Sequence, residues 1–185
     1  MTNPTVLNKN SVSVKKQTIV ALLAIVAAVS LPQCFHVMGH MSGLGTALGE
    51  AFLPMHLPVL LAGLVAGSYA GAFAGLFSPL ISFALTGMPS AVMLPFMMIE
   101  LFSYGLITGL LSNSKMPCIA KVLTAQVGGR AVRAAAILMS VYAFGNTAIN
   151  TAIIWSSITA GIFGLVLQWT LIPLIMYRFD GKKSE

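Results

Sequence analysis

The chain contains few charged residues for its length. Only 8% of its 185 residues are charged and 57% are hydrophobic, whereas a soluble domain has about 25% charged residues. Because a soluble chain of this composition would lack the polar residues to cover its surface, we expect lipid to surround much of this one. The length corresponds to roughly five or six helical spans of about 20 residues with short connections, which leaves no room for a separate soluble domain.

Sequence patterns of common catalytic sites are missing as well. The chain has no phosphate-binding loop of the ATPase type, so we expect that it does not hydrolyse ATP itself. No serine lies in a glycine elbow of the hydrolase type. Only one acidic residue lies clearly inside an apolar run, so paired-carboxylate chemistry lacks a second group. The sequence therefore predicts a protein that is not an enzyme and has no cofactor or metal centre of its own.

The ten Lys and Arg residues fall into three clusters that long apolar stretches separate. Basic residues beside a membrane span stay on the cytoplasmic side during insertion, so the pattern predicts that the chain starts, returns midway and ends in the cytoplasm. This topology explains the net charge of +6 without a nucleic-acid partner, and some attraction to anionic lipid headgroups is expected. The clusters are Lys9, Lys15 and Lys16; Lys115, Lys121, Arg130 and Arg133; and Arg178, Lys182 and Lys183.

We therefore predict an all-α integral membrane protein with six transmembrane helices and cytoplasmic termini. Pro32 is expected to end the first span, and a glycine-rich outer loop at about 33–54 is expected to fold over the helices as a lid. A basic inner loop is expected at about 112–130, and polar cytoplasmic tails at 1–16 and 179–185. Within the membrane domain, 17–178, the expected spans are 17–31, 55–68, 70–86, 90–111, 131–153 and 156–177.

Residues 55–86 are divided into two short spans, because a single long span would place the middle basic cluster outside the cell. Gly63, Gly67, Gly71 and Gly75 recur here at every fourth position. Small residues at this spacing let helix backbones approach closely in lipid. The same spacing is equally typical of an ordinary tight helical hairpin.

Glu100 is the strongest candidate for a functional residue. It lies in the middle of the span 90–111, where an ionisable group is costly and usually faces a cavity or a partner. Met93, Met97 and Tyr104 share its helical face, so this face is predicted to line a pocket with apolar walls and one polar anchor. The alternative is a protonated Glu100 that forms a hydrogen bond with a neighbouring helix.

Further candidates lie near the predicted outer ends of the last two spans. Tyr142, Asn146 and Asn150 recur one turn apart in the span 131–153. Amides in lipid need partners, which would be either a neighbouring helix or a polar ligand. Trp155 lies at the same depth and would either stack on a ligand or anchor the chain at the membrane interface.

Histidines and methionines form a second group of candidates. Imidazole and thioether ligands together suit a soft transition metal, but the spacing is common. The favoured role is packing of the outer loop, with His40 or His56 touching the molecule that the loop covers. The residues are His36, His40, His56, Met38, Met41 and Met55.

The sequence resembles the substrate-binding S components of energy-coupling factor (ECF) vitamin transporters. The likeness covers most of residues 17–177 and is carried by residues 53–63, with the sequence LPMHLPVLLAG, by the following stretch from Gly67 to Gly75, by Ser78-Pro79-Leu80 and by Thr86-Gly87-Met88-Pro89.

The resemblance implies a bacterial plasma-membrane protein that holds a water-soluble vitamin among its last three helices, under the first outer loop. It also implies a transmembrane coupling subunit and two ABC ATPases as partners, and toppling of the S component to release its cargo. In this family an Ala-x-x-x-Ala patch on the first helix contacts the coupling subunit, and Ala24 and Ala28 match that pattern.

Several cargoes and two other functions remain open at this point. The cargo candidates are pantothenate, cobalamin or its ribazole precursor, pyrimidine precursors and folate. Because the predicted outer half has no Lys or Arg while Glu100 lines the pocket, a neutral or cationic cargo is favoured; an anionic one would need helix N-termini, amides or protonated histidines. The other functions are a cobalt or nickel uptake component and an intramembrane enzyme or assembly factor.

Overall fold

The computed structural model describes residues 12–181, so the outer parts of the two predicted tails, 1–11 and 182–185, lie outside the described residues. Within the described part every regular element is an α-helix, which confirms the all-α prediction. The helices are α1 (Val14–Met41), α2 (Ala47–Phe52), α3 (His56–Ala66), α4 (Ser68–Thr86), α5 (Leu94–Leu111), α6 (Cys118–Tyr142), α7 (Ile153–Ala160) and α8 (Ile162–Gly181).

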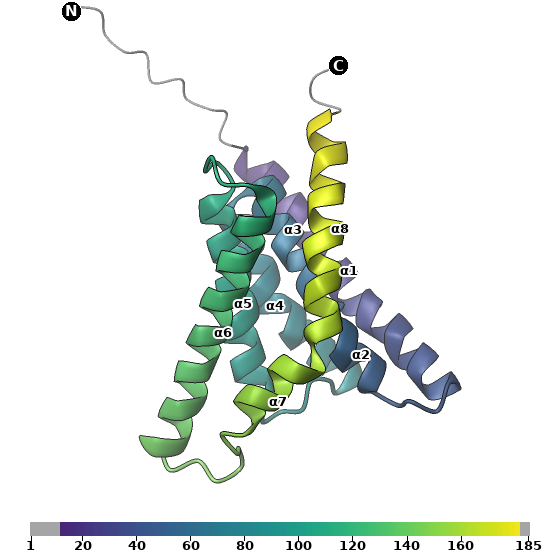
Figure 1. Cartoon of the computed structure of the whole chain (residues 1–185), viewed down its shortest axis with the longest axis vertical. Helices are drawn as coiled ribbons and strands as arrows, with labels where there is room; N and C mark the ends of the chain where they lie inside the picture. Colours follow the sequence, from purple (N-terminus) through teal and green to yellow (C-terminus); the bar gives the residue numbers. More distant parts are fainter. Residues whose placement is uncertain (1–11, 182–185) are drawn as a thin grey trace, which may run out of the picture.

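The helices form an up-and-down bundle (Figure 1). Five stretches are long and apolar enough to cross a membrane, and the pair α7 and α8, bent by 51° at Gly161, makes a sixth. The start of α1, the α5–α6 connection and the end of α8 lie at one end of the bundle, the top of Figure 1. This arrangement gives the even number of crossings that the sequence predicts, while the side of the membrane on which this end lies stays a prediction.

The first helix does not end at Pro32, so that prediction was wrong. α1 continues to Met41, and Pro32 is a buried residue inside it. Proline is tolerated within membrane helices because neighbouring groups satisfy the freed backbone carbonyl. Much of the predicted lid, 33–54, is therefore helical: it consists of the last turns of α1, a short turn with Gly43 and Gly45 at positive φ, and α2.

The helices α3, α4 and α5 are packed backbone against backbone. A Cβ atom on Gly71 would overlap the backbone of Gly105, and one on Gly105 would overlap the backbone of Gly71. A Cβ on Gly75 would meet the backbone of Leu101 in the same way. The glycines thus allow the close helix approach that their spacing predicts, and Gly67, at φ +99°, makes the turn from α3 to α4.

The second half of the chain differs from the prediction in its boundaries. α6 begins at Cys118, so only residues 112–117 connect it to α5, and the predicted inner loop at 112–130 is mostly helix. Arg130, which was expected in the loop, and Arg133, which was expected at the start of a span, consequently both lie well inside a membrane-length helix. The charge rule fails for these two arginines because a buried carboxylate on α5 accompanies them, as described below.

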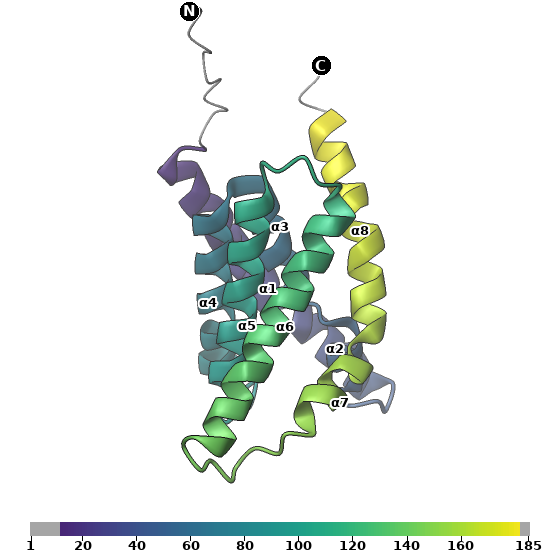
Figure 2. The same cartoon turned by 60° about the vertical axis from the view of Figure 1, so that its left-hand side comes forward.

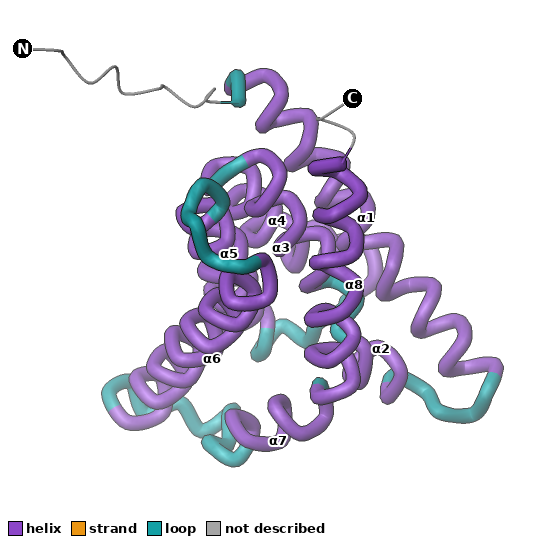
Figure 3. Tube along the Cα trace, turned by 45° about the horizontal axis from the view of Figure 1, so that its top comes forward, coloured by secondary structure: helices purple, strands orange, loops and turns teal. Residues whose placement is uncertain are grey.

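The helices of the second half diverge toward the end at which α7 lies. Figures 1 and 2 both show α6 leaning away from α8 there, with the short α7 running between them. The connection from α6 to α7, residues 143–152, lies at this end of the bundle (Figure 3). No residue of α7 is fully buried, but Ile153 and Ile154 pack against the cluster that Phe96, Ile137 and Ile149 form.

Candidate functional site

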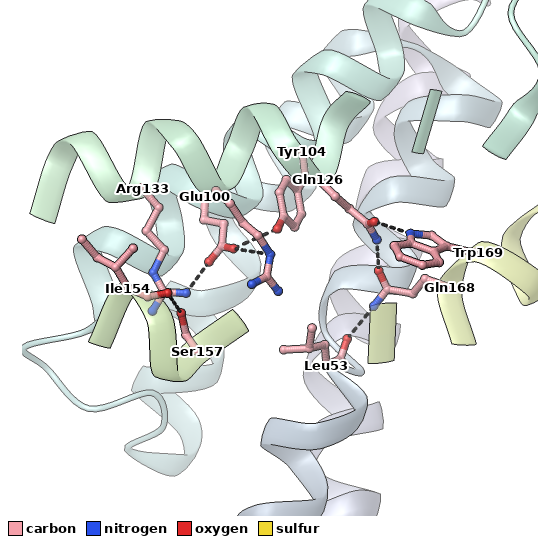
Figure 4. Close-up of polar contacts among 10 residues, drawn as sticks. Leu53, Glu100, Tyr104, Gln126, Arg133, Ile154, Ser157, Gln168 and Trp169 are labelled. Atoms are coloured by element: carbon pink, nitrogen blue, oxygen red, sulfur yellow. Dashed lines mark hydrogen bonds and ion pairs between the residues drawn. The ribbon is translucent and has the colours of Figure 1, made fainter. Parts of the chain in front are cut away.

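Glu100 lies on α5, where the first half of the bundle, α1 to α5, meets the second half, α6 to α8. We call this boundary the seam. The Glu100 side chain is only 1% exposed. The Tyr104 hydroxyl, one turn further along α5, donates a 2.9 Å hydrogen bond to its Oε1. From α6, Arg133 Nη1 donates a 2.8 Å hydrogen bond to its Oε2, and Arg130 Nε lies 4.0 Å from its Oε1 (Figure 4). The predicted partner on a neighbouring helix exists, but it is a pair of arginines, so the carboxylate is ion-paired rather than protonated.

A glycine on α6 makes room for this arrangement. A Cβ on Gly129 would overlap the ring of Tyr104, so the tyrosine can pack flat against α6 only because this residue has no side chain. Tyr104 is fully buried, and its position aims the hydroxyl at Glu100. The same close approach of α5 and α6 brings Arg130 and Arg133, which are one helical turn apart, next to the carboxylate.

The sequence prediction missed both arginines because it placed Arg130 in the inner loop and Arg133 at the start of the fifth span, and counted both only as markers of the cytoplasmic side. A signal was available: Ala131 and Val132 separate them, and Ala134 to Ile137 follow, which is unusual for a basic loop. A lone glutamate in the neighbouring span also needs a counter-charge. Their spacing of three residues places both on one face of a helix.

His56, at the start of α3, completes the cluster. Its ring centroid lies 5.4 Å from that of Tyr104, and the residue is only 4% exposed. Its Nδ1 makes no hydrogen bond to any residue that the structure describes. The structure therefore brings together three of the predicted site residues, Glu100, Tyr104 and His56, and adds two that were not predicted.

The cluster contains polar atoms that the rest of the described chain leaves unsatisfied. Nε and Nη1 of Arg130 and Nε of Arg133 are buried and make no hydrogen bond to a described residue. Both arginine side chains are 15% exposed. A cavity of about 20 Å³ adjoins them, and it is lined by Arg130, Arg133, Ala134, Ile137, Ile154, Ser157 and Ile158 from α6 and α7. Buried donors without acceptors are costly, so these nitrogens beside the cavity are candidates for binding a polar ligand group.

A family comparison agrees with the fold. The sequence model of the family described as ECF transporter, substrate-specific component, matches residues 15–176. This chain belongs to that family. Comparisons with curated proteins and with solved structures found no match.

Membership of the family identifies the chain as an S component, a subunit that gives a transporter its substrate specificity and is not an enzyme. It places the protein in the plasma membrane as a multi-pass protein, together with the other subunits of the ECF module and a transported substrate. The sequence-based prediction of the family, the fold class and the location is therefore confirmed.

The sequence predicted that Asn146 and Asn150 lie on a helix, and for this S component that prediction was wrong. α6 ends at Tyr142, which is 77% exposed, and Asn146 and Asn150 lie in the connection 143–152. Gly145, at φ +65°, takes the chain out of the helix. Both asparagines accept hydrogen bonds from backbone N–H groups two residues ahead, at Ala148 and Ala152, a local pattern that competes with helix formation.

The remaining predicted residues lie apart from the cluster. Met97 packs against the core formed by α1, α3 and α4, and Trp155 on α7 is 73% exposed. His40 is exposed in the last turn of α1. His36 of the same helix contacts Gly49 of α2. The described residues contain no group of three or more His, Cys, Asp or Glu side chains arranged to hold a metal ion.

The predicted contact surface for the coupling subunit is not on the outside of the S component. Ala24 is 8% exposed and Ala28 is fully buried, and both pack with residues of α3, α4 and α5. The small side chains are used for close packing within the chain, which corrects the predicted position of this patch. Leu22, Leu23 and Val26 form the exposed face of α1.

A second polar network holds α8 against the rest of the S component. Gln126 Nε2 of α6 donates a 2.8 Å hydrogen bond to Gln168 Oε1, and Trp169 Nε1 donates one of 2.6 Å to Gln126 Oε1. Gln168 Nε2 donates to the carbonyl oxygen of Leu53, between α2 and α3 (Figure 4). Gln168 is 1% exposed. Its hydrogen bonds connect α8 both to α6 and to the segment 33–54 that was predicted to be a lid.

Proposed function

We propose that this S component is the substrate-binding subunit of an ECF-type ABC importer for a water-soluble vitamin or vitamin precursor. The observation that carries the proposal is the buried cluster of Glu100, Arg130 and Arg133, with Tyr104 and His56 beside it. Charged groups inside a membrane bundle are costly and usually mark a substrate site. The unsatisfied arginine donors fit a site that is completed by its cargo.

A larger groove is a weaker candidate for the cargo site. It has a volume of about 780 Å³ and lies between α5 and α6, with Val132, Ala136 and Met139 in its wall. Of the polar residues lining it, Ser140 and Asn146 already form a hydrogen bond with each other at 2.9 Å. No charged residue lines it, so it offers a cargo no strong polar anchor.

Cargo binding at the cluster requires a movement. The cavity beside Arg130 and Arg133 has the volume of about one water molecule, whereas pockets for vitamin-sized ligands measure roughly 300–1,000 Å³. The helix α7 forms its second wall through Ile154, Ser157 and Ile158. Because no residue of α7 is buried, we expect α7 and the connection before it to move outward when cargo enters.

The importer also needs partners that this chain lacks. In the proposed complex, a transmembrane coupling subunit contacts the S component and two ABC ATPases supply the energy by hydrolysing ATP. Since Ala24 and Ala28 are covered, we place the coupling subunit against the exposed face of α1 that Leu22, Leu23 and Val26 form. Apolar residues on such a face suit a neighbouring membrane helix as well as they suit lipid.

The test is to identify the small molecule that stays with the protein through mild purification, by mass spectrometry, and to measure its affinity. Glu100→Gln should weaken binding of that molecule, because the neutral amide no longer holds the two guanidinium groups in place. Glu50→Gln is the matched control, since Glu50 is exposed on α2. Equal affinity in the two variants, or a cargo that is not a vitamin or vitamin precursor, would contradict the proposal.

A further inference from the structure

We propose that the cargo carries an anionic group, a carboxylate or a phosphate, which Arg130 and Arg133 bind, and that Glu100 is a positioning residue for the two guanidinium groups. This inference rests on the proposed function, because it assumes that the cavity at the cluster receives the cargo. It reverses the sequence-based expectation of a neutral or cationic cargo.

The charges of the bundle support an anionic ligand. Two guanidinium groups face one carboxylate, so the cluster has an excess of one positive charge. Between Arg133 and Arg178 the sequence contains no charged residue, and between Lys16 and Lys115 it contains only Glu50 and Glu100. Glu50 is exposed and accepts a hydrogen bond from Thr46, so it does not neutralise the cluster. An excess charge in a membrane interior is costly until a counter-ion binds.

The unsatisfied atoms specify the kind of group that would bind. Besides Nδ1 of His56, they are N–H donors, on Nε and Nη1 of Arg130 and Nε of Arg133, and the partner that these three donors require is an acceptor. The planar guanidinium group forms paired hydrogen bonds with carboxylate and phosphate oxygens. A cationic cargo would instead meet two arginines and only one carboxylate.

Glu100 is already occupied and is poorly placed to bind a cationic cargo. Its two carboxylate oxygens accept hydrogen bonds from Tyr104 and Arg133. Tyr104 is itself fixed against Gly129, so the carboxylate holds a defined position. Its function is then to keep the arginines inside the bundle and to orient them toward the cavity.

The other walls of the cavity indicate the rest of the cargo. Ile137 on α6 and Ile154 and Ile158 on α7 are apolar, and the Ser157 hydroxyl donates to the Ile154 carbonyl at 3.1 Å. Beyond the two arginines, the cavity lining therefore contains one polar side chain, and that one is engaged locally. We infer a cargo with an anionic end at the arginines and a less polar part against the isoleucines.

The test compares matched pairs of compounds on the full-length protein in detergent, by thermal shift and by titration calorimetry. Pantothenate with pantothenol, and nicotinate with nicotinamide, test the carboxylate; riboflavin monophosphate with riboflavin tests the phosphate. The molecule that is retained on purification is added to the panel once its mass is known. We expect only anionic members to bind, and the pair that responds distinguishes the two anions.

Variants test the role of the arginines. Arg130→Gln and Arg133→Gln should each weaken binding of the responding compound about 10- to 100-fold, the range expected for lost charged hydrogen bonds. Arg133→Lys should restore part of the affinity. Lys121→Gln removes a positive charge from the same helix, at an amine that bonds the Ser112 carbonyl, and should bind like the original chain.

The outcomes separate the two proposals. A neutral or cationic retained cargo, or equal binding of both members of a pair, would overturn the anionic cargo and leave the proposed function in place. This comparison uses the unaltered chain, so it holds even if an arginine variant fails to fold. If nothing is retained and no compound of the panel binds, the proposed function fails and the anionic cargo fails with it.

Discussion

The two halves of the bundle are held together by different kinds of contact. In the first half, α4 and α5 meet where Gly71 and Gly105 bring backbone against backbone, which leaves no space between them. In the second half, α6 is connected to its neighbours by polar side chains, through Arg133 to α5 and through Gln126 to α8. Backbone contact of the first kind tolerates almost no movement, whereas in the second half polar bonds add to the apolar packing of Val122, Ala125 and Ile137.

This difference indicates how an S component can be both stable and able to admit cargo. The glycine-packed half provides a fixed support for Glu100, which lies on α5 at the seam. The other half supplies the arginines, the unsatisfied donors and α7, of which no residue is fully buried. A binding site at the seam can then change on one side only, with its anchor held in place on the other.

The largest effect is expected when the carboxylate at the seam is removed. Glu100→Ala leaves Arg130 and Arg133 buried without their counter-charge, and loss of one partner from a buried ion pair typically costs about 3–5 kcal/mol. Unfolding of the purified protein in detergent should occur at a much lower temperature or denaturant concentration. Glu50→Ala is the control, and it should change the free energy of unfolding by less than about 0.5 kcal/mol because Glu50 is exposed. Equal stability of the two variants would mean that the seam does not depend on this ion pair.

The second effect compares the same methyl group added in the two halves. Gly105→Ala forces a Cβ atom into the backbone of Gly71, whereas Gly128→Ala on α6 meets only the end of the Ile107 side chain, which can rotate away. Both changes improve helix propensity equally. Gly105→Ala should therefore cost roughly 1–3 kcal/mol, while Gly128→Ala should be neutral or stabilising. Similar values from chemical unfolding would show that the two halves are packed alike.

The sequence predicted the glycine-packed half better than the polar half. The division at Gly67 and the spacing of Gly63, Gly71 and Gly75 were read correctly because close helix packing in lipid depends on local spacing. Glu100 was identified because a single acidic residue within an apolar span has few explanations. Both inferences need only one segment of the sequence.

The polar half depends on contacts between distant segments, which no local pattern reveals. Arg130 and Arg133 were grouped with Lys115 and Lys121 because the positive-inside rule does not take a buried counter-charge into account. This error moved the start of the fifth span and placed Asn146 and Asn150 on a helix. Pro32 was misread for a related reason, since a proline ends a helix in water more readily than in a packed membrane bundle.

A third, intermediate effect is expected where α8 joins the bundle. Gln168→Leu keeps the approximate volume of the side chain but leaves Gln126 Nε2 without its acceptor, while Leu53 O keeps only the hydrogen bond from the His56 N–H. Unsatisfied buried polar groups cost about 1–3 kcal/mol. Thr170→Val is a matched control on the same helix, because Thr170 is exposed and its hydroxyl bonds only carbonyls of its own helix. A loss as large as that of Glu100→Ala would show that this network, rather than the ion pair, holds the second half together.

The smallest effect is expected in the connection before α7, and it decides what the asparagines do. Asn150 Oδ1 accepts a hydrogen bond from the Ala152 N–H at 2.9 Å, and the residue is exposed. Asn150→Ala should cost less than about 1 kcal/mol, because exposed local bonds of this type contribute little. Asn150→Asp should restore the stability, since it keeps the accepting oxygen, and neither variant should alter the affinity for the retained cargo. If both variants bind that cargo more weakly at unchanged stability, the amide contacts the cargo directly. The binding site then extends from the seam to the connection between α6 and α7.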